Sequence, residues 1–288
     1  MSRKDRIDLG GKTILITGAG SGIGAASARA LHAKGANVIL LDLTQAGTQP
    51  LAQELGSARS LSVMADVTDR RQLDTAVRAG LQKFGRVDIV FANAGIACDP
   101  PTTVRCMDEQ TFEHIIEVDL FGVTRTVQAC LPEIIKNKGH VLMTASTSAF
   151  INGIANVPYG IAKAGVEMFG RSLRAELART GATAGVLLPC WTKTPIAANA
   201  LGAHELSARL VKRGFPPFLR KPITPETVAQ AVVKGMENRS ANIFRPRRWA
   251  LISMARGLFN PITDRAIARD KLMQDLIAKL EAETMGRE

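Results

Sequence analysis

Short apolar runs alternate with longer segments of helical periodicity up to about residue 190 of the chain. The apolar runs are rich in leucine and β-branched residues on both faces, which is typical of parallel strands buried between helices. They cover residues 13–17, 38–41, 61–65, 89–92, 140–145 and 184–188, and segments of helix length lie between them, among them residues 22–34, 69–84 and 158–179. This order predicts one continuous α/β domain with a doubly wound parallel sheet.

The pattern changes after Pro189. Residues 190–222 hold several prolines and many apolar side chains, and a segment of this length in a compact domain is usually a functional lid or carries short helices of its own. Thr224 followed by Pro225 predicts a helix start, because threonine caps helices and proline suits their first position. With a last strand at residues 241–244, we expect one domain over residues 1–245 that includes a lid at 190–222.

Residues 246–288 form a C-terminal extension that is basic and then amphipathic. Apolar residues recur at helical spacing, first at 251, 252, 255, 258 and 259, and then at 272, 276, 277 and 280. Such a helical extension can dock on its own protein or on a neighbouring subunit. The arginines near Trp249 also permit peripheral contact with an anionic membrane surface, and the sequence leaves these alternatives open.

The chain has 288 residues, is 46% hydrophobic and carries a net charge of +11. The positive charge is concentrated in acid-free stretches at residues 209–221 and 245–256. No nucleic-acid motif accompanies these stretches and aromatic residues make up only 5% of the chain, so we expect no nucleic-acid partner. No apolar run reaches the roughly 18 residues of a membrane-spanning helix, and the N-terminus does not resemble a signal peptide.

The cysteines and histidines show no pattern typical of a metal site. The four cysteines are scattered without a C-x-x-C pair, and the four histidines are equally dispersed. We read the histidines as structural or surface residues and expect no bound metal. Free thiols are typical of a reducing compartment, which predicts a cytoplasmic protein.

Tyr159 and Lys163 are four residues apart, so in a helix they lie on the same face. An ammonium close to a phenol favours the phenolate, and we therefore expect the Tyr159 pKa to fall below its usual value of about 10. A phenol with a lowered pKa is a usable general acid and base near neutral pH. Together with Ser146, thirteen residues upstream, and the glycine-rich turn at residues 17–24, the pair indicates hydride transfer between a nicotinamide cofactor and an alcohol or carbonyl.

A glycine-rich turn from Thr17 to Gly24 joins the first predicted strand to the first predicted helix. Glycines there let the backbone approach a pyrophosphate, whose charge is met by the helix N-terminus. Asp42 ends the second strand, where a carboxylate can accept hydrogen bonds from the ribose hydroxyls and would repel a 2′-phosphate. No basic residue adjoins it, which favours NAD over NADP, although Asp42 could also simply cap the strand.

These motifs resemble the short-chain dehydrogenase/reductase family. The resemblance covers residues 8–200 or so and rests on the Thr-Gly-x-x-x-Gly-x-Gly turn, the Asn93-Ala94-Gly95 segment, and Ser146, Tyr159 and Lys163 in the family's order and spacing. It implies a Rossmann-like sheet of about seven strands, a bound NAD(H) or NADP(H), and a homodimer or homotetramer. The cofactor-binding residues would be Gly18, Ser21, Gly22, Ile23, Gly24, Asp42, Leu43, Asp66, Val67, Asn93, Ala94, Gly95, Tyr159, Lys163, Thr192 and Thr194.

The resemblance also implies roles for individual residues. Tyr159 would exchange a proton with the substrate oxygen, Ser146 would hold that oxygen, and Lys163 would lower the Tyr159 pKa and bind the nicotinamide ribose. Asp119 stands where the family usually has an asparagine that supports a proton-relay water. We expect it to serve the same part, with impaired catalysis as an alternative. Cys190, where the family often has glycine, could reshape the loop near the nicotinamide.

The sequence as a whole predicts an NAD-dependent oxidoreductase acting on a secondary alcohol or ketone. The apolar side chains of the lid favour a lipophilic substrate such as a steroid, a terpenoid or a long-chain acyl group, although they could equally serve only to pack the lid. One alternative is a 3-oxoacyl reductase, whose acidic carrier could meet the basic stretch at 209–221. Another is a binding protein that senses NAD(H) without turnover.

Overall fold

The computed structural model describes residues 6–198 and 204–286. Three predicted parts lie outside the described residues: Leu201 of the lid, the first residues of the domain and the last residues of the extension. Seven parallel strands form one sheet in the order β3-β2-β1-β4-β5-β6-β7. The strands are β1 (Thr13–Thr17), β2 (Asn37–Asp42), β3 (Ser60–Met64), β4 (Ile89–Ala92), β5 (His140–Thr144), β6 (Thr183–Pro189) and β7 (Asn242–Arg245). The predicted Rossmann-like fold is confirmed.

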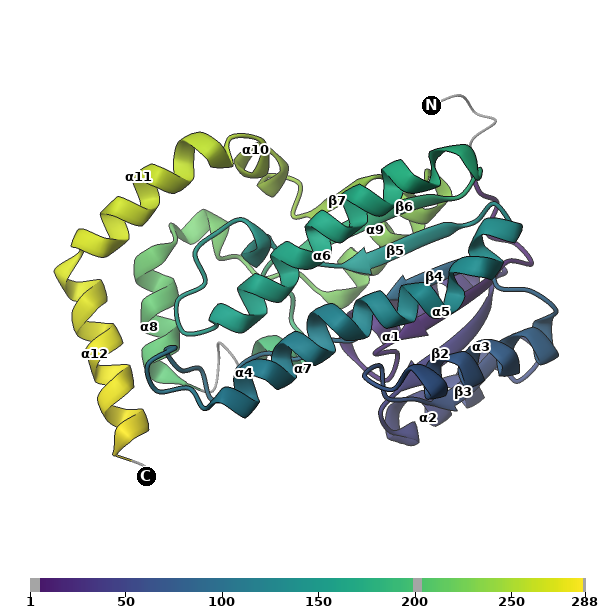
Figure 1. Cartoon of the computed structure of the whole chain (residues 1–288), viewed down its shortest axis with the longest axis horizontal. Helices are drawn as coiled ribbons and strands as arrows, with labels where there is room; N and C mark the ends of the chain where they lie inside the picture. The colour runs from purple at the N-terminus through teal and green to yellow at the C-terminus, as the bar shows by residue number, and fades with distance from the viewer. Residues whose placement is uncertain (1–5, 199–203, 287–288) are drawn as a thin grey trace.

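Helices cover both faces of the sheet, as Figure 1 shows. Alternate side chains of each strand enter different cores because successive residues point to opposite faces. In β1, Ile14 and Ile16 pack with α1 and α9, whereas Leu15 packs on the side of α3 and α5. The principal helices are α1 (Gly22–Ala33), α2 (Gln45–Leu55), α3 (Arg70–Phe84), α4 (Glu109–Ile116), α5 (Val123–Lys136), α6 (Val157–Glu176) and α9 (Pro225–Glu237).

The predicted helix start at Thr224 is confirmed. Its side chain accepts a hydrogen bond from the Thr227 backbone N–H, and Pro225 occupies the first turn of α9. This cap satisfies one of the backbone donors that a helix N-terminus leaves open. The cap therefore marks the end of the lid and the start of α9, which leads to the last strand of the sheet.

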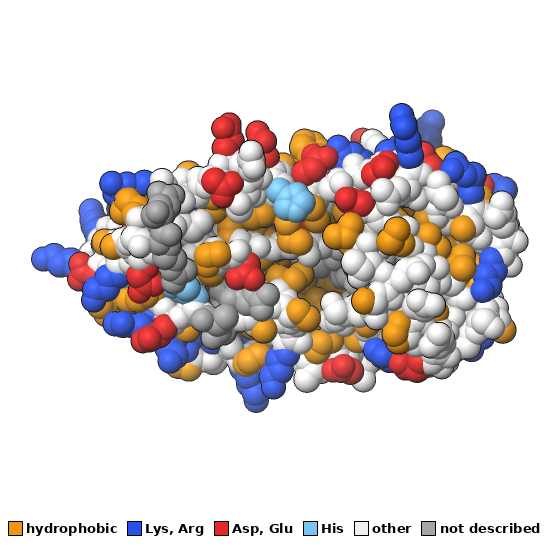
Figure 2. All heavy atoms as spheres, turned by 90° about the horizontal axis from the view of Figure 1, so that it is seen from below, with side chains coloured by type: hydrophobic (Ala, Val, Ile, Leu, Met, Phe, Trp, Pro, Cys, Tyr) orange, Lys and Arg blue, Asp and Glu red, His pale blue; other side chains and the backbone are white. Residues whose placement is uncertain are grey.

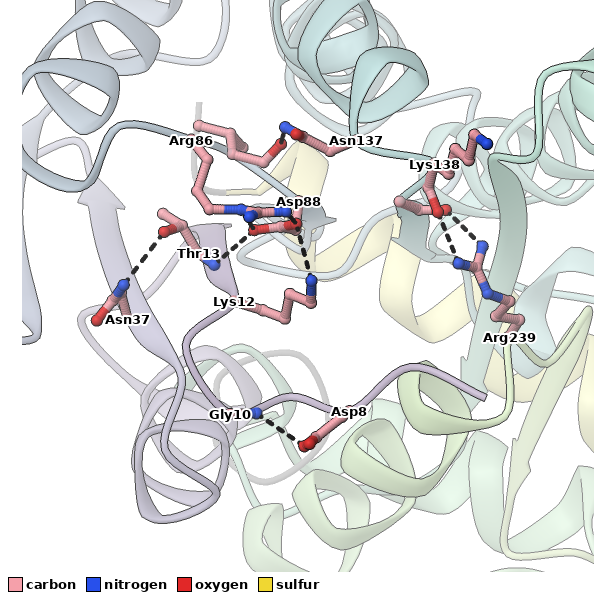
Figure 3. A network of polar contacts seen from close by, with 12 residues as sticks. Asp8, Gly10, Lys12, Thr13, Asn37, Arg86, Asp88, Asn137, Lys138 and Arg239 are labelled. Carbon is pink, nitrogen blue, oxygen red and sulfur yellow. Dashed lines mark hydrogen bonds and ion pairs between the residues drawn. The ribbon is translucent and has the colours of Figure 1, made fainter. Parts of the chain in front are cut away.

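A polar network closes the amino end of the sheet (Figure 3). Asp88, which immediately precedes β4, is 2% exposed. Its carboxylate accepts hydrogen bonds from the Thr13 backbone N–H at 3.0 Å and from the Arg86 guanidinium, and Lys12 approaches it to 3.7 Å. Nearby, Arg239 donates to the carbonyls of the turn that precedes β5. This edge is held by polar contacts and is not associated with the large cavity described below.

The lid and the C-terminal extension lie beyond the carboxyl end of the sheet. The lid contains α7 (Pro195–Ala197), α8 (Glu205–Gly214) and a short 3₁₀ helix at Pro217–Leu219. The extension forms an arm at one end of the molecule (Figure 1), made of α10 (Trp249–Met254), α11 (Arg256–Arg269) and α12 (Lys271–Met285). α12 packs on α8 through a small apolar cluster of Leu206, Leu210, Met273, Leu276 and Leu280. The extension therefore docks on its own chain, one of the alternatives that the sequence left open.

Candidate active site

A cavity of about 830 Å³ lies at the carboxyl ends of the strands. This is the edge at which open α/β sheets bind ligands. Seen from below, the surface is hollowed in the middle and hydrophobic side chains gather around the hollow (Figure 2). Of the residues predicted from the sequence, those that line the cavity are Gly18, Ser21, Gly22, Ile23, Asp42, Leu43, Asp66, Val67, Asn93, Ala94, Gly95, Ser146, Tyr159, Lys163, Thr192 and Thr194.

Two predicted residues, Gly24 and Asp119, lie behind the cavity wall. A Cβ atom on Gly24 would lie 2.0 Å from the Gly18 carbonyl oxygen, so only glycine lets α1 pack against the turn that precedes it. Gly18 itself has a φ of +63°, and its Cβ would lie 2.9 Å from the Ala94 Cα. The turn thus approaches both its own helix and the end of β4 as closely as backbone allows. This leaves its outer side open to the cavity.

Asp42 fastens the end of β2 to this turn. Its carboxylate oxygens accept hydrogen bonds from the backbone N–H groups of Gly20 and Leu43, each at 2.8 Å. Gly47 in α2 packs against Gly20 so closely that a Cβ on Gly47 would lie 2.4 Å from the Gly20 carbonyl oxygen. The sequence reasoning missed Gly47, because it stands outside the glycine-rich motif. Asp42 is therefore part of the turn's own structure as well as of the cavity wall.

Asn93 joins three strands at the base of the cavity. Its amide group donates to the Thr17 carbonyl oxygen at 3.2 Å and accepts from the Thr144 hydroxyl at 3.0 Å. The Thr17 hydroxyl in turn accepts from the backbone N–H of Asn93 and Ala94. These bonds fix the ends of β1, β4 and β5 relative to one another. The predicted Asn93-Ala94-Gly95 segment thus acts first as a structural brace.

Ser146 and Tyr159 both line the cavity, and their side chains meet there. Ser146 follows β5 and caps a short 3₁₀ helix at Thr147–Ala149, where its hydroxyl accepts from the Ser148 backbone N–H at 3.1 Å. Tyr159 stands in the first turn of α6 and is partly exposed. A hydrogen bond from Ser146 to the Tyr159 phenol favours the phenolate. The structure thus brings together Ser146 and Tyr159, as expected from their spacing.

Lys163 lies one turn along α6 and points into the interior. Its ammonium is 2.8 Å from the Asp119 carboxylate and 5.3 Å from the centre of the Tyr159 ring. The other oxygen of Asp119 accepts the Ile96 backbone N–H at 2.7 Å. A Cβ on Gly95 would lie 3.1 Å from both Asp119 and Lys163, so the ion pair fills the space that a side chain there would need.

Asp119 is placed by a feature that the sequence analysis did not foresee. Residues Glu117–Gly122 form a π-helical turn between α4 and α5. Such turns insert an extra residue into a helix and are frequent at functional sites. Here the turn carries the fully buried Asp119 against Lys163. No local composition signal announces the π turn, whose backbone is otherwise helical.

The expected lowering of the Tyr159 pKa is wrong for this structure. Tyr159 is only partly exposed, and the burial of the rest of its side chain raises its pKa, an effect that the nearby ammonium of Lys163 only partly opposes. Burial also acts to lower the Lys163 pKa, but attraction to Asp119 and Tyr159 outweighs it and the pKa is raised. The negative charge of Asp119, in direct contact with Lys163, acts on the Tyr159 pKa in the opposite direction and raises it. The phenol is therefore neutral at pH 7.

The segment after β6 closes the far side of the cavity. The Thr192 hydroxyl donates to the Cys190 carbonyl, and the Thr194 hydroxyl accepts from the Ala197 backbone N–H at the start of α7. Cys190 is buried, and burial raises the pKa of its thiol to about 12, so it is an unreactive thiol. All four cysteines are free.

The C-terminal extension contributes to the cavity wall, which the sequence analysis missed. Trp249 in α10 is buried among Phe150 and Phe215, at ring distances of 6.4 Å from each. The helical spacing of the extension was visible, but its position over the cavity depends on how the arm folds back. The residues that reach the cavity are Trp249, Ile252, Phe259, Asn260, Thr263, Ile267 and Met273.

Within residues 6–198 and 204–286, no group of three or more histidine, cysteine, aspartate or glutamate side chains is arranged to hold a metal ion. In the same part of the chain, no helix combines the length and the apolar character needed to cross a membrane.

The chain is similar to known oxidoreductases. The short chain dehydrogenase family matches residues 12–204. An uncharacterized oxidoreductase of Staphylococcus aureus (strain MW2) is 32% identical over 230 residues, which are 80% of this chain and 92% of the relative. An uncharacterized oxidoreductase of Staphylococcus epidermidis is 33% identical over 64% of this chain and 80% of its own length.

Solved structures agree with this likeness. A 3-ketoacyl-(acyl-carrier-protein) reductase from Brucella melitensis complexed with NADH is 28% identical, with a TM-score of 0.74 over 82% of this chain and 97% of its own. A short chain dehydrogenase/reductase from Burkholderia phymatum in complex with NAD has a TM-score of 0.75 over 86% and 93% at 22% identity, which supports the fold alone. From the family match, the curated relatives and the fold together, this chain belongs to the short-chain dehydrogenase family of oxidoreductases.

Proposed function

We propose that the protein is an NAD-dependent oxidoreductase that interconverts a lipophilic secondary alcohol and its ketone. The observation that carries this proposal is the meeting of Ser146, Tyr159 and Lys163 in one cavity with the glycine-rich turn. A hydroxyl, a phenol and an ammonium at the carboxyl end of a parallel sheet suit proton exchange at a substrate oxygen. Residues 246–288 are then an extension added to the dehydrogenase domain.

The cavity fits a dinucleotide because glycine backbone, without side chains, forms its wall at the start of α1. A side chain on Gly18 would collide with Ala94 and one on Gly22 would crowd Thr194, and both glycines have positive φ angles that favour glycine. We assign Gly18, Ser21, Gly22 and Ile23 to the pyrophosphate, with Asp66 and Val67 at the adenine and Thr192 and Thr194 at the carboxamide. When bound, the nicotinamide would supply or accept the hydride.

Tyr159 is the proposed acid and base at the substrate oxygen, and Ser146 is the group that holds this oxygen. Because burial raises the Tyr159 pKa, the phenol keeps its proton at neutral pH. It is therefore ready to donate that proton to a carbonyl oxygen, which favours ketone reduction near pH 7. Alcohol oxidation needs the phenolate and should accelerate as the pH is raised.

NAD is the proposed cofactor because of the charge at the end of β2. The Asp42 carboxylate lines the cavity there, and its neighbour Leu43 is apolar. Among the described residues, Lys163 supplies the cationic side chain of the cavity wall, and it is already paired with Asp119. A 2′-phosphate beside Asp42 would meet a like charge without a compensating cation.

The substrate is proposed to be lipophilic because apolar side chains from three parts of the chain line the space beyond Tyr159. They come from the loop before α6, from the lid and from the extension, and include Ile151, Leu210, Phe215, Ile252, Phe259, Ile267 and Met273. Burying apolar surface is the main source of affinity for such a ligand, about 25 cal/mol for each Å² removed from water.

The test is a steady-state assay with NADH and NADPH over a series of ketones from small hydroxyketones to steroid-sized ones. We expect reduction of bulky apolar ketones with NADH and little with NADPH. In an Asp42→Ala variant the preference for NADH should fall by about tenfold, because the repelling carboxylate is gone. Equal use of both cofactors by the unaltered protein would contradict the NAD assignment, and reduction of small polar ketones alone would contradict the substrate class.

A 3-oxoacyl reductase is the second candidate. It is favoured by the likeness to the Brucella melitensis enzyme, whose name states this activity, and by the exposed basic side chains of α8. In this case the apolar chamber would take the acyl chain. Reduction of 3-oxoacyl thioesters at rates well above those for matched ketones without a thioester would favour this candidate over the first.

A further inference from the structure

The outer face of α10 and α11 exposes a row of large apolar side chains. Leu251, Met254, Leu258 and Ile262 are 68%, 76%, 69% and 61% exposed. They recur every three or four residues, and only Ala255 separates the two helices. Exposed apolar groups at this density mark an interaction surface more often than a bare protein face.

The opposite face of α11 is already occupied. Arg256 pairs with the mostly buried Glu167 of α6 at 2.8 Å, and the Asn260 amide donates to the Phe150 carbonyl at 3.1 Å. Thr263, one turn further on, lines the cavity. The inner face thus fixes α11 on the molecule, and the outer apolar face is left without a partner among residues 6–198 and 204–286.

Positive charge continues the same outer face. Arg265 and Arg269 follow Ile262 at helical spacing, and Arg247 and Lys271 flank the two helices. These four side chains are exposed and form no ion pair with any described residue. Residues 246–271 hold six cations and two carboxylates. Both carboxylates already accept hydrogen bonds from other parts of the chain.

We propose that this outer face of α10 and α11 binds an anionic lipid surface. Leu251, Met254, Leu258 and Ile262 enter the interface between headgroups and acyl chains, and the neighbouring arginines meet the negative headgroups. Charge decides between the candidate occupants. A second copy of the chain docked here about a two-fold axis would bring the same cations close together, whereas an anionic bilayer is complementary to them.

The proposal goes beyond the proposed function, and it has a structural link to the cavity. Phe259 of α11 lines the cavity and is also 47% exposed. The helix that contacts the lipid is therefore also part of the chamber wall. A lipophilic molecule held in the bilayer would then lie close to the chamber.

The test is sedimentation of the full-length protein with vesicles, without cofactor or substrate, so that its outcome is independent of catalysis. One set of vesicles contains equal parts of phosphatidylglycerol and phosphatidylcholine, and the other contains phosphatidylcholine alone. We expect binding to the anionic vesicles that weakens as salt is added. The double variant Leu258→Glu/Ile262→Glu should bind them at least about tenfold more weakly, because two charges replace apolar contacts.

Two further variants sharpen the test. Arg265→Glu/Arg269→Glu keeps the apolar row and removes the cations, so its residual binding should lose most of its salt dependence. Met64→Glu is the matched control, because Met64 is 60% exposed at the end of β3, outside the cavity and the arm, and its binding should be unchanged. Thermal unfolding of each variant shows that the fold is retained.

The proposal is overturned if the unaltered protein sediments equally little with both kinds of vesicle. It is also overturned if Leu258→Glu/Ile262→Glu turns an oligomer into a monomer in analytical ultracentrifugation and leaves lipid binding as it was. In that case the occupant of the face is a second copy of this chain.

Discussion

Two buried carboxylates, Asp88 and Asp119, lie at opposite ends of the same sheet and differ in what surrounds them. Asp88, at the amino end, is held by a backbone N–H and by Arg86 and Lys12, whose side chains are 40% and 31% exposed. Asp119, at the carboxyl end, pairs with Lys163, which is 3% exposed. The two cations beside Asp88 are partly exposed to solvent, whereas the ammonium of Lys163 beside Asp119 is buried.

The comparison shows why two buried carboxylates that both contact cations affect different properties of the protein. The partners of Asp88 hold the amino ends of the strands together (Figure 3), and none of them lines the cavity at the carboxyl ends. Around Asp119 the ammonium also faces Tyr159, and Asp119 itself acts to raise the Tyr159 pKa. A change of charge at the amino end should therefore alter stability. The same change at the carboxyl end should alter the protonation of the phenol.

The largest effect is expected at the carboxyl end, from Tyr159→Phe. If the phenol is the acid and base, its loss should lower kcat by about 10²–10⁴-fold, because this is the usual contribution of a positioned acid–base group. Binding of NADH, followed by its fluorescence, should persist. Activity within a few-fold of the unaltered protein would show that another group moves the proton.

At the amino end, Asp88→Ala should act on stability. Removing the carboxylate leaves the buried Thr13 N–H without its acceptor, which typically costs about 1–3 kcal/mol, whereas the partly exposed Arg86 can be hydrated. Urea unfolding measures this loss. The kcat of the fraction that remains folded should be unchanged, because the site lies at the other end of the strands. A parallel loss of kcat in fully folded protein would break the comparison.

His140 gives the amino end a pH dependence of its own. Burial, with smaller contributions from Arg239 and Arg174, lowers the His140 pKa to about 3. Below pH 6.5 or so the unfolded chain binds a proton on this imidazole and the folded chain does not. The free energy of unfolding should therefore fall as the pH is lowered, by up to about 1.4 kcal/mol for each pH unit.

The matched variant is His140→Gln, measured by urea unfolding between pH 6.5 and 5. This window lies above the range in which most carboxylates titrate. The variant should have a shallower slope than the unaltered protein. An equal slope in both would mean that another group carries the dependence.

The smallest effect is expected from Asp119→Asn, which puts an amide in place of the carboxylate. Asp119 raises the Tyr159 pKa by its charge, so its removal should lower that pKa. The pH at which alcohol oxidation is half-maximal should move down, by about one unit. The pH profile of kcat/KM is the readout, because a merely structural defect would reduce the rate without moving the profile. An unmoved profile would mean that Asp119 does not act on the phenol.

Much of this arrangement could be read from the sequence because its signals are local. Strand composition and helix spacing predicted the sheet and its principal helices, with the ends of β1 and β4 placed as observed. Parallel strands place their carboxyl ends at one edge, so motifs after β1, β4 and β5 were expected to meet there. Gly18, Asn93, Ser146 and Tyr159 do so in the structure. The predicted oligomer stays a prediction.

What the sequence by itself determined is thus the fold, the family and the position of the chemistry, since each depends on residues near one another or on strand order. Only the tertiary structure decided the protonation of Tyr159, because burial and the Asp119–Lys163 contact join residues from separate elements. It also decided that the C-terminal arm forms part of the chamber. Helical periodicity tells which residues share a face, but not which neighbour that face meets. That depends on how the chain folds back, which brings Met273 of α12 against α8 and into the cavity wall.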